Sequence, residues 1–169
     1  EGRVVWHGHP MAGLDRTIEQ ILQGKYDLEA AKQAEHAEQD FREYLRRVGQ
    51  DAPDPEAAQL AERILANPAI SPFMLNEFSW AILTHPQIKH RDLPLALRAA
   101  KTAYDRTQGK EASITDTYAR AMFDSGKVAE AIRLQKEAIG ACDDANTRAQ
   151  LENTLKRYQD QAKPRSAAQ

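Results

Sequence analysis

Residues 118–138, Tyr-Ala-Arg-Ala-Met-Phe-Asp-Ser-Gly-Lys-Val-Ala-Glu-Ala-Ile-Arg-Leu-Gln-Lys-Glu-Ala, decide the fold. This stretch predicts two helices joined by a short turn, and the second helix places Ala131 and Ala138 two turns apart on one face. Ala96 and Ala103 show the same spacing 35 residues upstream. A fixed period of this length indicates stacked helical hairpins, in which small residues let paired helices approach closely.

The first helices of these two units also correspond. Phe78-Ser79 aligns with Tyr118-Ala119, so a large residue precedes a small one in each unit. The first unit has about five additional residues between its helices, in the loop at residues 85–92. Residues 28–66 form at best a degenerate third unit, and the polar last helix has the character of a cap because Leu151, Leu155 and Tyr158 share one face.

The spacing resembles that of the tetratricopeptide repeat over residues 73–143. The signature positions are occupied by Tyr118, Ala119, Met122, Gly126, Ala131 and Ala138. The chain departs from the pattern at Ala100 and Gln135, where an aromatic residue is usual on the second helix, and no closing proline follows residue 138.

The overall composition supports a helical protein. The chain has 169 residues with 28 alanines and only 4 valines, and alanine favours helices whereas valine favours strands. A sandwich, a barrel or a large parallel sheet is therefore excluded. The mean hydropathy of -0.68 and the lack of an apolar run near about 18 residues argue against a membrane span.

Apolar periodicity, prolines and glycines predict where the helices begin and end. The expected helices are residues 14–22, 28–48, 55–66, 72–84, 92–107, 111–125, 127–141 and 144–163. Only Arg3–Trp6 is a credible strand, and a strand so short needs sheet partners. We expect the tail beyond Lys163 to be frayed.

The N-terminal segment carries a second resemblance. Residues 1–11, Glu-Gly-Arg-Val-Val-Trp-His-Gly-His-Pro-Met, and the helix that follows to Asp27 resemble the end of a bacterial thioredoxin-like redoxin. Some redoxins continue into a helical extension with motifs similar to Leu75-Asn-Glu-Phe-Ser-Trp-Ala and Asp116-Thr-Tyr-Ala-Arg-Ala. The resemblance implies that a catalytic Cys-x-x-Cys lies upstream of Glu1, that the chain is a fragment, and that its location is extracytoplasmic.

Together these features predict an all-α fold built from tetratricopeptide-like helical hairpin repeats of the α-solenoid type. A short N-terminal strand and helix would remain from a thioredoxin fold. The expected domains are residues 1–27, the C-terminal remnant of a thioredoxin-like domain, and residues 28–169, the helical repeat domain.

Charge and cysteine content narrow the possible functions. The formal net charge is -2, with no basic stripe, so we expect no nucleic-acid partner. The single cysteine, Cys142, excludes an internal disulfide, a Cys-x-x-Cys pair and a cysteine-based zinc site. Its neighbours Asp143 and Asp144 should raise the pKa of the thiol and keep it unreactive.

No catalytic, metal or cofactor site can be defended from the sequence. His7 and His9 alternate as strand neighbours do, but two ligands without a third make a poor metal site, so we expect turn residues. His85 and His90 flank a loop that we expect to be solvated. Lys110 follows a glycine but lacks the other glycines of a phosphate loop. The carboxylates of the long second helix are interpreted as a solvated face: Glu35, Glu38, Asp40 and Glu43.

The candidate binding residues lie on the first helices of the repeats. In tetratricopeptide superhelices these helices line a concave surface that binds peptides or helices, which implies a groove in this chain. The residues expected to face that groove are Asn76, Trp80, Thr84, Asp116, Arg120 and Phe123. The alternative is that Trp80 is a core residue between repeats.

The sequence therefore favours a protein-interaction or scaffolding module of a redoxin, with a protein or peptide partner and no membrane partner. The alternative is a thiol-disulfide oxidoreductase or peroxidase whose active-site cysteines lie upstream. A third interpretation, a tetratricopeptide adaptor unrelated to thioredoxin, would leave residues 3–27 unexplained. The strand at Arg3–Trp6 could also pair with a second copy in a homodimer, because its edges are open.

Overall fold

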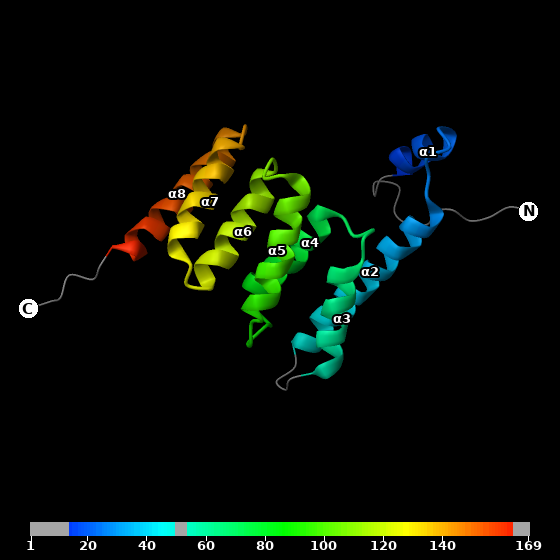
Figure 1. Cartoon of the computed structure of the whole chain (residues 1–169), viewed down its shortest axis with the longest axis horizontal. Helices are drawn as coiled ribbons and strands as arrows, with labels where there is room; N and C mark the ends of the chain where they lie inside the picture. The colour runs from blue at the N-terminus through cyan, green and yellow to red at the C-terminus, as the bar shows by residue number, and fades with distance from the viewer. Residues whose placement is uncertain (1–13, 50–53, 164–169) are drawn as a thin grey trace, which may run out of the picture.

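The structure, a computed structural model, describes residues 14–49 and 54–163, and these residues contain helices but no strand (Figure 1). The helices are α1 (Leu14–Leu22), α2 (Leu28–Val48), α3 (Pro55–Ala66), α4 (Pro72–Thr84), α5 (Leu93–Thr107), α6 (Ala112–Asp124), α7 (Val128–Gly140) and α8 (Ala145–Ala162). The expected all-α class is confirmed, and the expected bounds agree to within one residue at each end. The predicted strand and its dimer contact, His7, His9 and the tail from residue 164 lie outside the described residues.

The helix boundaries follow from local chemistry. Asp27, Ser71 and Asp92 each accept a hydrogen bond from a backbone N–H in the first turn of the helix that follows, which satisfies a donor the helix itself leaves open. At the other end, Gly24 and Gly126 adopt φ values of 65° and 77°, where a side chain would be strained. These caps account for several of the helix ends, whereas α6 and α7 begin without a side-chain cap.

The helices pack as consecutive hairpins along the long axis of the molecule (Figure 1). Helix α2 packs on α3, α4 on α5 and α6 on α7, while α5 also contacts α6, and α7 contacts α8. The first helices α4 and α6 of neighbouring hairpins also contact each other. The arrangement therefore brings α4 and α6 together on one side of the stack.

Small residues lie where the paired helices meet. Ser79 on α4 and Ala96 on α5 are fully buried, and the Ser79 Oγ donates a hydrogen bond to the Ala96 carbonyl oxygen at 2.9 Å. Ala119 and Ala131, the corresponding residues of α6 and α7, are also fully buried. The prediction that the alanines of the second helices serve as packing positions is confirmed, because Ala96, Ala103, Ala131 and Ala138 are all 0% exposed.

The first hairpin joins the second through aromatic contacts. The rings of Phe41 and Tyr44 on α2 meet the ring of Phe78 on α4 edge to face, with centroids 5.3 and 4.9 Å apart. On the surface, the Arg98 guanidinium donates two hydrogen bonds to the Glu62 carboxylate, which ties α5 to α3. Residues 28–66 thus continue the stack even though their sequence shows little of the repeat pattern.

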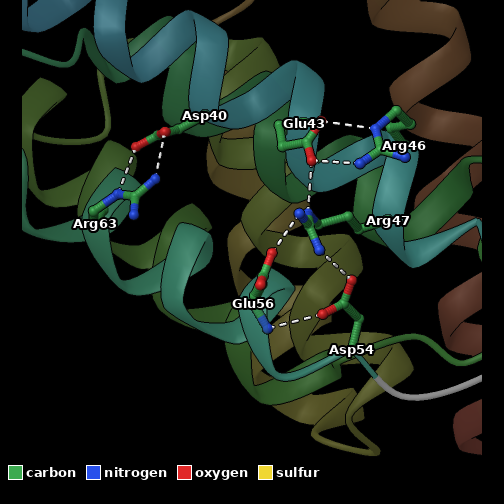
Figure 2. Close-up of polar contacts among 7 residues, drawn as sticks. All are labelled: Asp40, Glu43, Arg46, Arg47, Asp54, Glu56 and Arg63. Atoms are coloured by element: carbon green, nitrogen blue, oxygen red, sulfur yellow. Dashed lines mark hydrogen bonds and ion pairs between the residues drawn. The ribbon is translucent and has the colours of Figure 1, made fainter.

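Ion pairs hold α2 against α3 (Figure 2). Arg63 on α3 donates two hydrogen bonds to Asp40 on α2. Arg47 on α2 contacts Glu43, Asp54 and Glu56, and so connects α2 to the start of α3. Asp40 and Glu43, which were expected on a solvated face, therefore take part in two separate sets of ion pairs where α2 meets α3.

Helix α1 presents apolar side chains to its surroundings. Ile18, Ile21 and Leu22, which the sequence places on one apolar face, are 45%, 39% and 81% exposed. A large part of this apolar surface is therefore exposed, most of all at Leu22.

The close contact between α6 and α7 leads to a prediction about Ala131. Ala131→Leu should lower the free energy of unfolding by about 1 to 3 kcal/mol, because Ala131 is fully buried and a larger side chain would force the helices apart. The control is Ala129→Leu, on the exposed side of the same helix. This variant should change the free energy of unfolding by about 0.5 kcal/mol or less. Urea unfolding followed by circular dichroism measures both. Equal effects of the two variants would contradict close packing at Ala131.

The network between α2 and α3 predicts a pH dependence of stability. Hydrogen bonds from Arg46 and Arg47 lower the pKa of Glu43 from 4.5 to about 2. Because the pKa in the folded state is lowered, ionised Glu43 stabilises the fold above pH 4.5, and this stabilisation is lost as the pH falls towards 2. Glu43→Gln should therefore lower the melting temperature at neutral pH. The difference in melting temperature between this variant and the unchanged chain should shrink as the pH falls from 4.5 towards 2.

The control for this measurement is Glu38→Gln. Glu38 lies on the same helix and pairs with Arg42 at 3.7 Å, with both side chains exposed, so the variant should have little effect. A difference between Glu43→Gln and the unchanged chain that stayed constant down to acidic pH would contradict the role of the ion pairs.

Candidate binding cavity

A cavity of about 410 Å³ lies between α4, α6 and α8. Its walls are formed by Asn76, Trp80, Ser113, Asp116, Thr117, Thr147, Gln150, Leu151 and Thr154. Helix α4 contributes Asn76 and Trp80, which lie one turn apart, and α6 contributes Asp116. Three of the six residues expected to face a groove thus line one cavity.

The other three expected groove residues lie outside the walls of this cavity. The Thr84 hydroxyl donates a hydrogen bond to the Trp80 carbonyl oxygen at 2.7 Å. Arg120 forms an ion pair with Asp124, with the Nε and Oδ2 atoms 2.7 Å apart. The ring of Phe123 stacks on Tyr158 of α8, with centroids 4.1 Å apart, so its contacts are with the capping helix.

The Trp80 side chain is partly exposed to solvent. Its residue surface is 43% exposed, which does not fit a core residue enclosed between repeats. An indole that is held at a cavity wall and still contacts solvent offers a large apolar surface at a low cost in conformational entropy.

A hydrogen bond from a buried glutamine, Gln135, positions the Asp116 carboxylate. Its Oδ1 accepts a hydrogen bond from the Nε2 of Gln135 at 2.7 Å, and the same nitrogen donates to the Leu151 carbonyl oxygen at 3.2 Å. Gln135 on α7 is fully buried, so it connects α6 with α8 beneath the cavity. Burial raises the pKa of Asp116, while Gln135 and the nearby Arg120 and Arg157 act in the opposite direction.

Three buried polar atoms near this site have no hydrogen-bond partner among the described residues. They are the Oδ1 of Asn76, the Oε1 of Gln135 and the hydroxyl of Tyr158. Burial also raises the pKa of Tyr158 to about 12. Unpartnered buried oxygens reduce stability, and most native proteins contain few of them. Of these three residues, Asn76 lines the cavity and Gln135 bonds to Asp116, so polar groups next to the cavity are incompletely satisfied.

The polar groups at the cavity walls are one carboxylate, several hydroxyls and amides, and the indole N–H of Trp80. The cavity walls contain one carboxylate but no histidine, cysteine or lysine. Cys142 lies elsewhere, buried, with its thiol donating to the Asp144 carbonyl oxygen at 3.4 Å. Among the described residues, no group of three histidine, cysteine, aspartate or glutamate side chains could hold a metal ion.

A second cavity, of about 350 Å³, lies where the first hairpin meets α5. Its walls include Tyr44, Ala61, Glu62, Leu95 and Arg98. Burial raises the pKa of Tyr44 to about 12, and the negative charge of Asp92 acts in the same direction. Sequence patterns did not indicate this cavity, because it arises between units that share no motif.

Sequence reasoning also missed part of the first cavity. The residues of α8 at its wall, Thr147, Gln150, Leu151 and Thr154, belong to a helix expected to serve only as a cap. Gln135 was identified only as a departure from the repeat pattern. That departure was the available signal, because a polar residue at a buried position needs a polar partner.

No family model matches this chain, and no curated protein or solved structure matches it either. Among the described helices, none has the length and apolar character needed to cross a membrane.

The hydrogen bond beneath the cavity predicts the effect of Gln135→Leu on Asp116. Burial raises the pKa of Asp116 and the Gln135 hydrogen bond lowers it, so removing the amide should raise that pKa further. A pH titration of the Asp116 carboxyl carbon by nuclear magnetic resonance measures the change. Gln150→Leu alters a wall residue that has no hydrogen bond to Asp116 and should leave the pKa unchanged. Equal pKa values in both variants would show that the Gln135 bond has no influence.

Proposed function

We propose that this chain is a non-catalytic protein-interaction module that binds a segment of a partner protein in the cavity between α4, α6 and α8. The observation that carries the proposal is Trp80, a large aromatic side chain that is 43% exposed at the wall of this cavity. Aromatic residues that are partly exposed in a concavity are frequent anchors of protein interfaces.

We further propose that the repeats are tetratricopeptide-like. In support, α4 and α6, the first helices of successive hairpins, contact each other, and small residues lie at equivalent places in the two units. In such a stack the first helices form a continuous surface, and this is where Asn76, Trp80 and Asp116 are found.

The relation to a redoxin is part of the same proposal and rests on the resemblance of residues 1–27. The second candidate is an oxidoreductase or peroxidase with its reactive cysteines upstream. Cys142, the single cysteine of this chain, is buried and cannot by itself cycle through an intramolecular disulfide, so the second candidate depends entirely on cysteines upstream of Glu1. Sequencing the coding region upstream of Glu1 tests the relation: a Trp-Cys-x-x-Cys motif there supports a redoxin, and its absence favours an unrelated adaptor.

The proposed anchor leads to a prediction about Trp80. Peptides are first selected from a random display library by binding to the full chain. Trp80→Ala should then weaken the binding of these peptides by about 2 kcal/mol or more, equivalent to about thirtyfold. Fluorescence anisotropy with labelled peptides measures the loss, and circular dichroism measures the melting temperature, which should change little because Trp80 is largely exposed.

The matched control is Phe73→Ala. Phe73 lies on the same helix and is 53% exposed, but it does not line the cavity. This variant should bind the selected peptides as the unchanged chain does. Unchanged affinity in Trp80→Ala, or a large drop in its melting temperature, would contradict the proposed function.

A further inference from the structure

The cavity between α4, α6 and α8 has a one-sided charge. Asp116 is the only ionisable side chain among its nine wall residues, and the other polar members carry hydroxyl or amide groups. An anionic ligand group would therefore meet a carboxylate without a cation at the wall to offset it. The charge favours a positively charged ligand group.

Asp116 keeps one oxygen available. Its Oδ1 is used by Gln135, whereas its Oδ2 accepts no hydrogen bond from the described residues. Arg120 and Arg157, the two arginines that lower the pKa of Asp116, each contact another side chain. Arg120 pairs with Asp124 at 2.7 Å, and the Arg157 guanidinium lies 5.5 Å from the centre of the Tyr158 ring. Neither arginine lines the cavity.

Two further groups at the wall suit a cation. The Trp80 indole is exposed, and tryptophan is the aromatic side chain that attracts cations most strongly through its ring face. The Asn76 amide, one turn before Trp80, has an oxygen with no partner. A cationic donor needs acceptors of this kind, and an amide that rotates would present its oxygen to the cavity.

We infer that this cavity receives a cationic side chain, a lysine or an arginine, from the bound segment of the partner protein. The inference rests on the proposed function and specifies its ligand. Asp116 supplies the countercharge, Trp80 the aromatic face and Asn76 an acceptor. The remaining wall residues, which are mostly threonine, serine and glutamine, solvate the charged group.

The experiment uses the full chain labelled with nitrogen-15 and three small probes. These probes are the Nα-acetyl methylamides of lysine, norleucine and glutamate, which share a backbone and differ in the charge of the side chain. The signals of the Trp80 indole N–H and the Asn76 side-chain amide report binding. We expect saturable shifts with the lysine probe, and an affinity at least about tenfold higher than for norleucine, as loss of a charge-assisted hydrogen bond predicts.

Asp116→Asn should abolish the preference for lysine over norleucine. It should not lower the melting temperature, because the amide can still accept the Gln135 hydrogen bond and no charge is left to bury. Ser113→Lys is a second variant, on an exposed residue of the cavity wall. It places an ammonium group beside Asp116 and should block the lysine probe without altering Asp116.

Equal affinities for lysine and norleucine, a preference for glutamate, or no saturable shift with lysine would each overturn the inference. Retention of the lysine preference in Asp116→Asn or in Ser113→Lys would overturn it as well, because the cation would then bind elsewhere. These failures are distinct from failure of the proposed function. Selected peptides that depend on Trp80 but carry no essential basic residue would support peptide binding and reject the cation site.

Discussion

The close approach of two helices within each hairpin is the constraint on which the rest of the structure depends. Ser79 donates a hydrogen bond to the Ala96 carbonyl oxygen, and both residues, like Ala119 and Ala131, are fully buried. Neighbouring hairpins then contact each other in two ways, through α5 with α6 and through the first helices α4 and α6. The cavity lies beside the contact between α4 and α6, and its walls come from α4, α6 and α8.

Several groups near the cavity lower the stability of the folded state. A carboxylate whose pKa is raised by burial and three buried oxygens without partners are unfavourable in a helical stack. The amide of Gln135 offsets part of this by bonding both Asp116 and the Leu151 carbonyl oxygen. The first hairpin shows the opposite arrangement, because Arg47 satisfies Glu43, Asp54 and Glu56 together (Figure 2). Polar groups thus have partners where α2 packs on α3, and several lack partners near the cavity where a ligand is proposed to bind.

Much of the fold could be predicted from the sequence, because its signals are local. Capping residues and prolines determine the helix ends, and the alanine period sets the register of the hairpins. The site could be predicted only in part. Repeat alignment identifies Asn76, Trp80 and Asp116, but the wall formed by α8 and the support from Gln135 depend on contacts between distant residues. The pairing of Arg63 with Asp40 was hidden for the same reason, since a polar helix face does not reveal which of its charges meets another helix.

The serial contact pattern has a consequence for how the chain acquires its structure. Most helix contacts link elements that follow one another directly, and α4 with α6 is the longest step among the main ones. Little chain entropy is lost in closing such short loops, so folding is expected to be fast. Each hairpin can form as soon as its second helix has been synthesised and then serve as a template for the next. On a ribosome, the order of synthesis and the order of assembly would coincide, and the cavity would be completed only when α8 emerges.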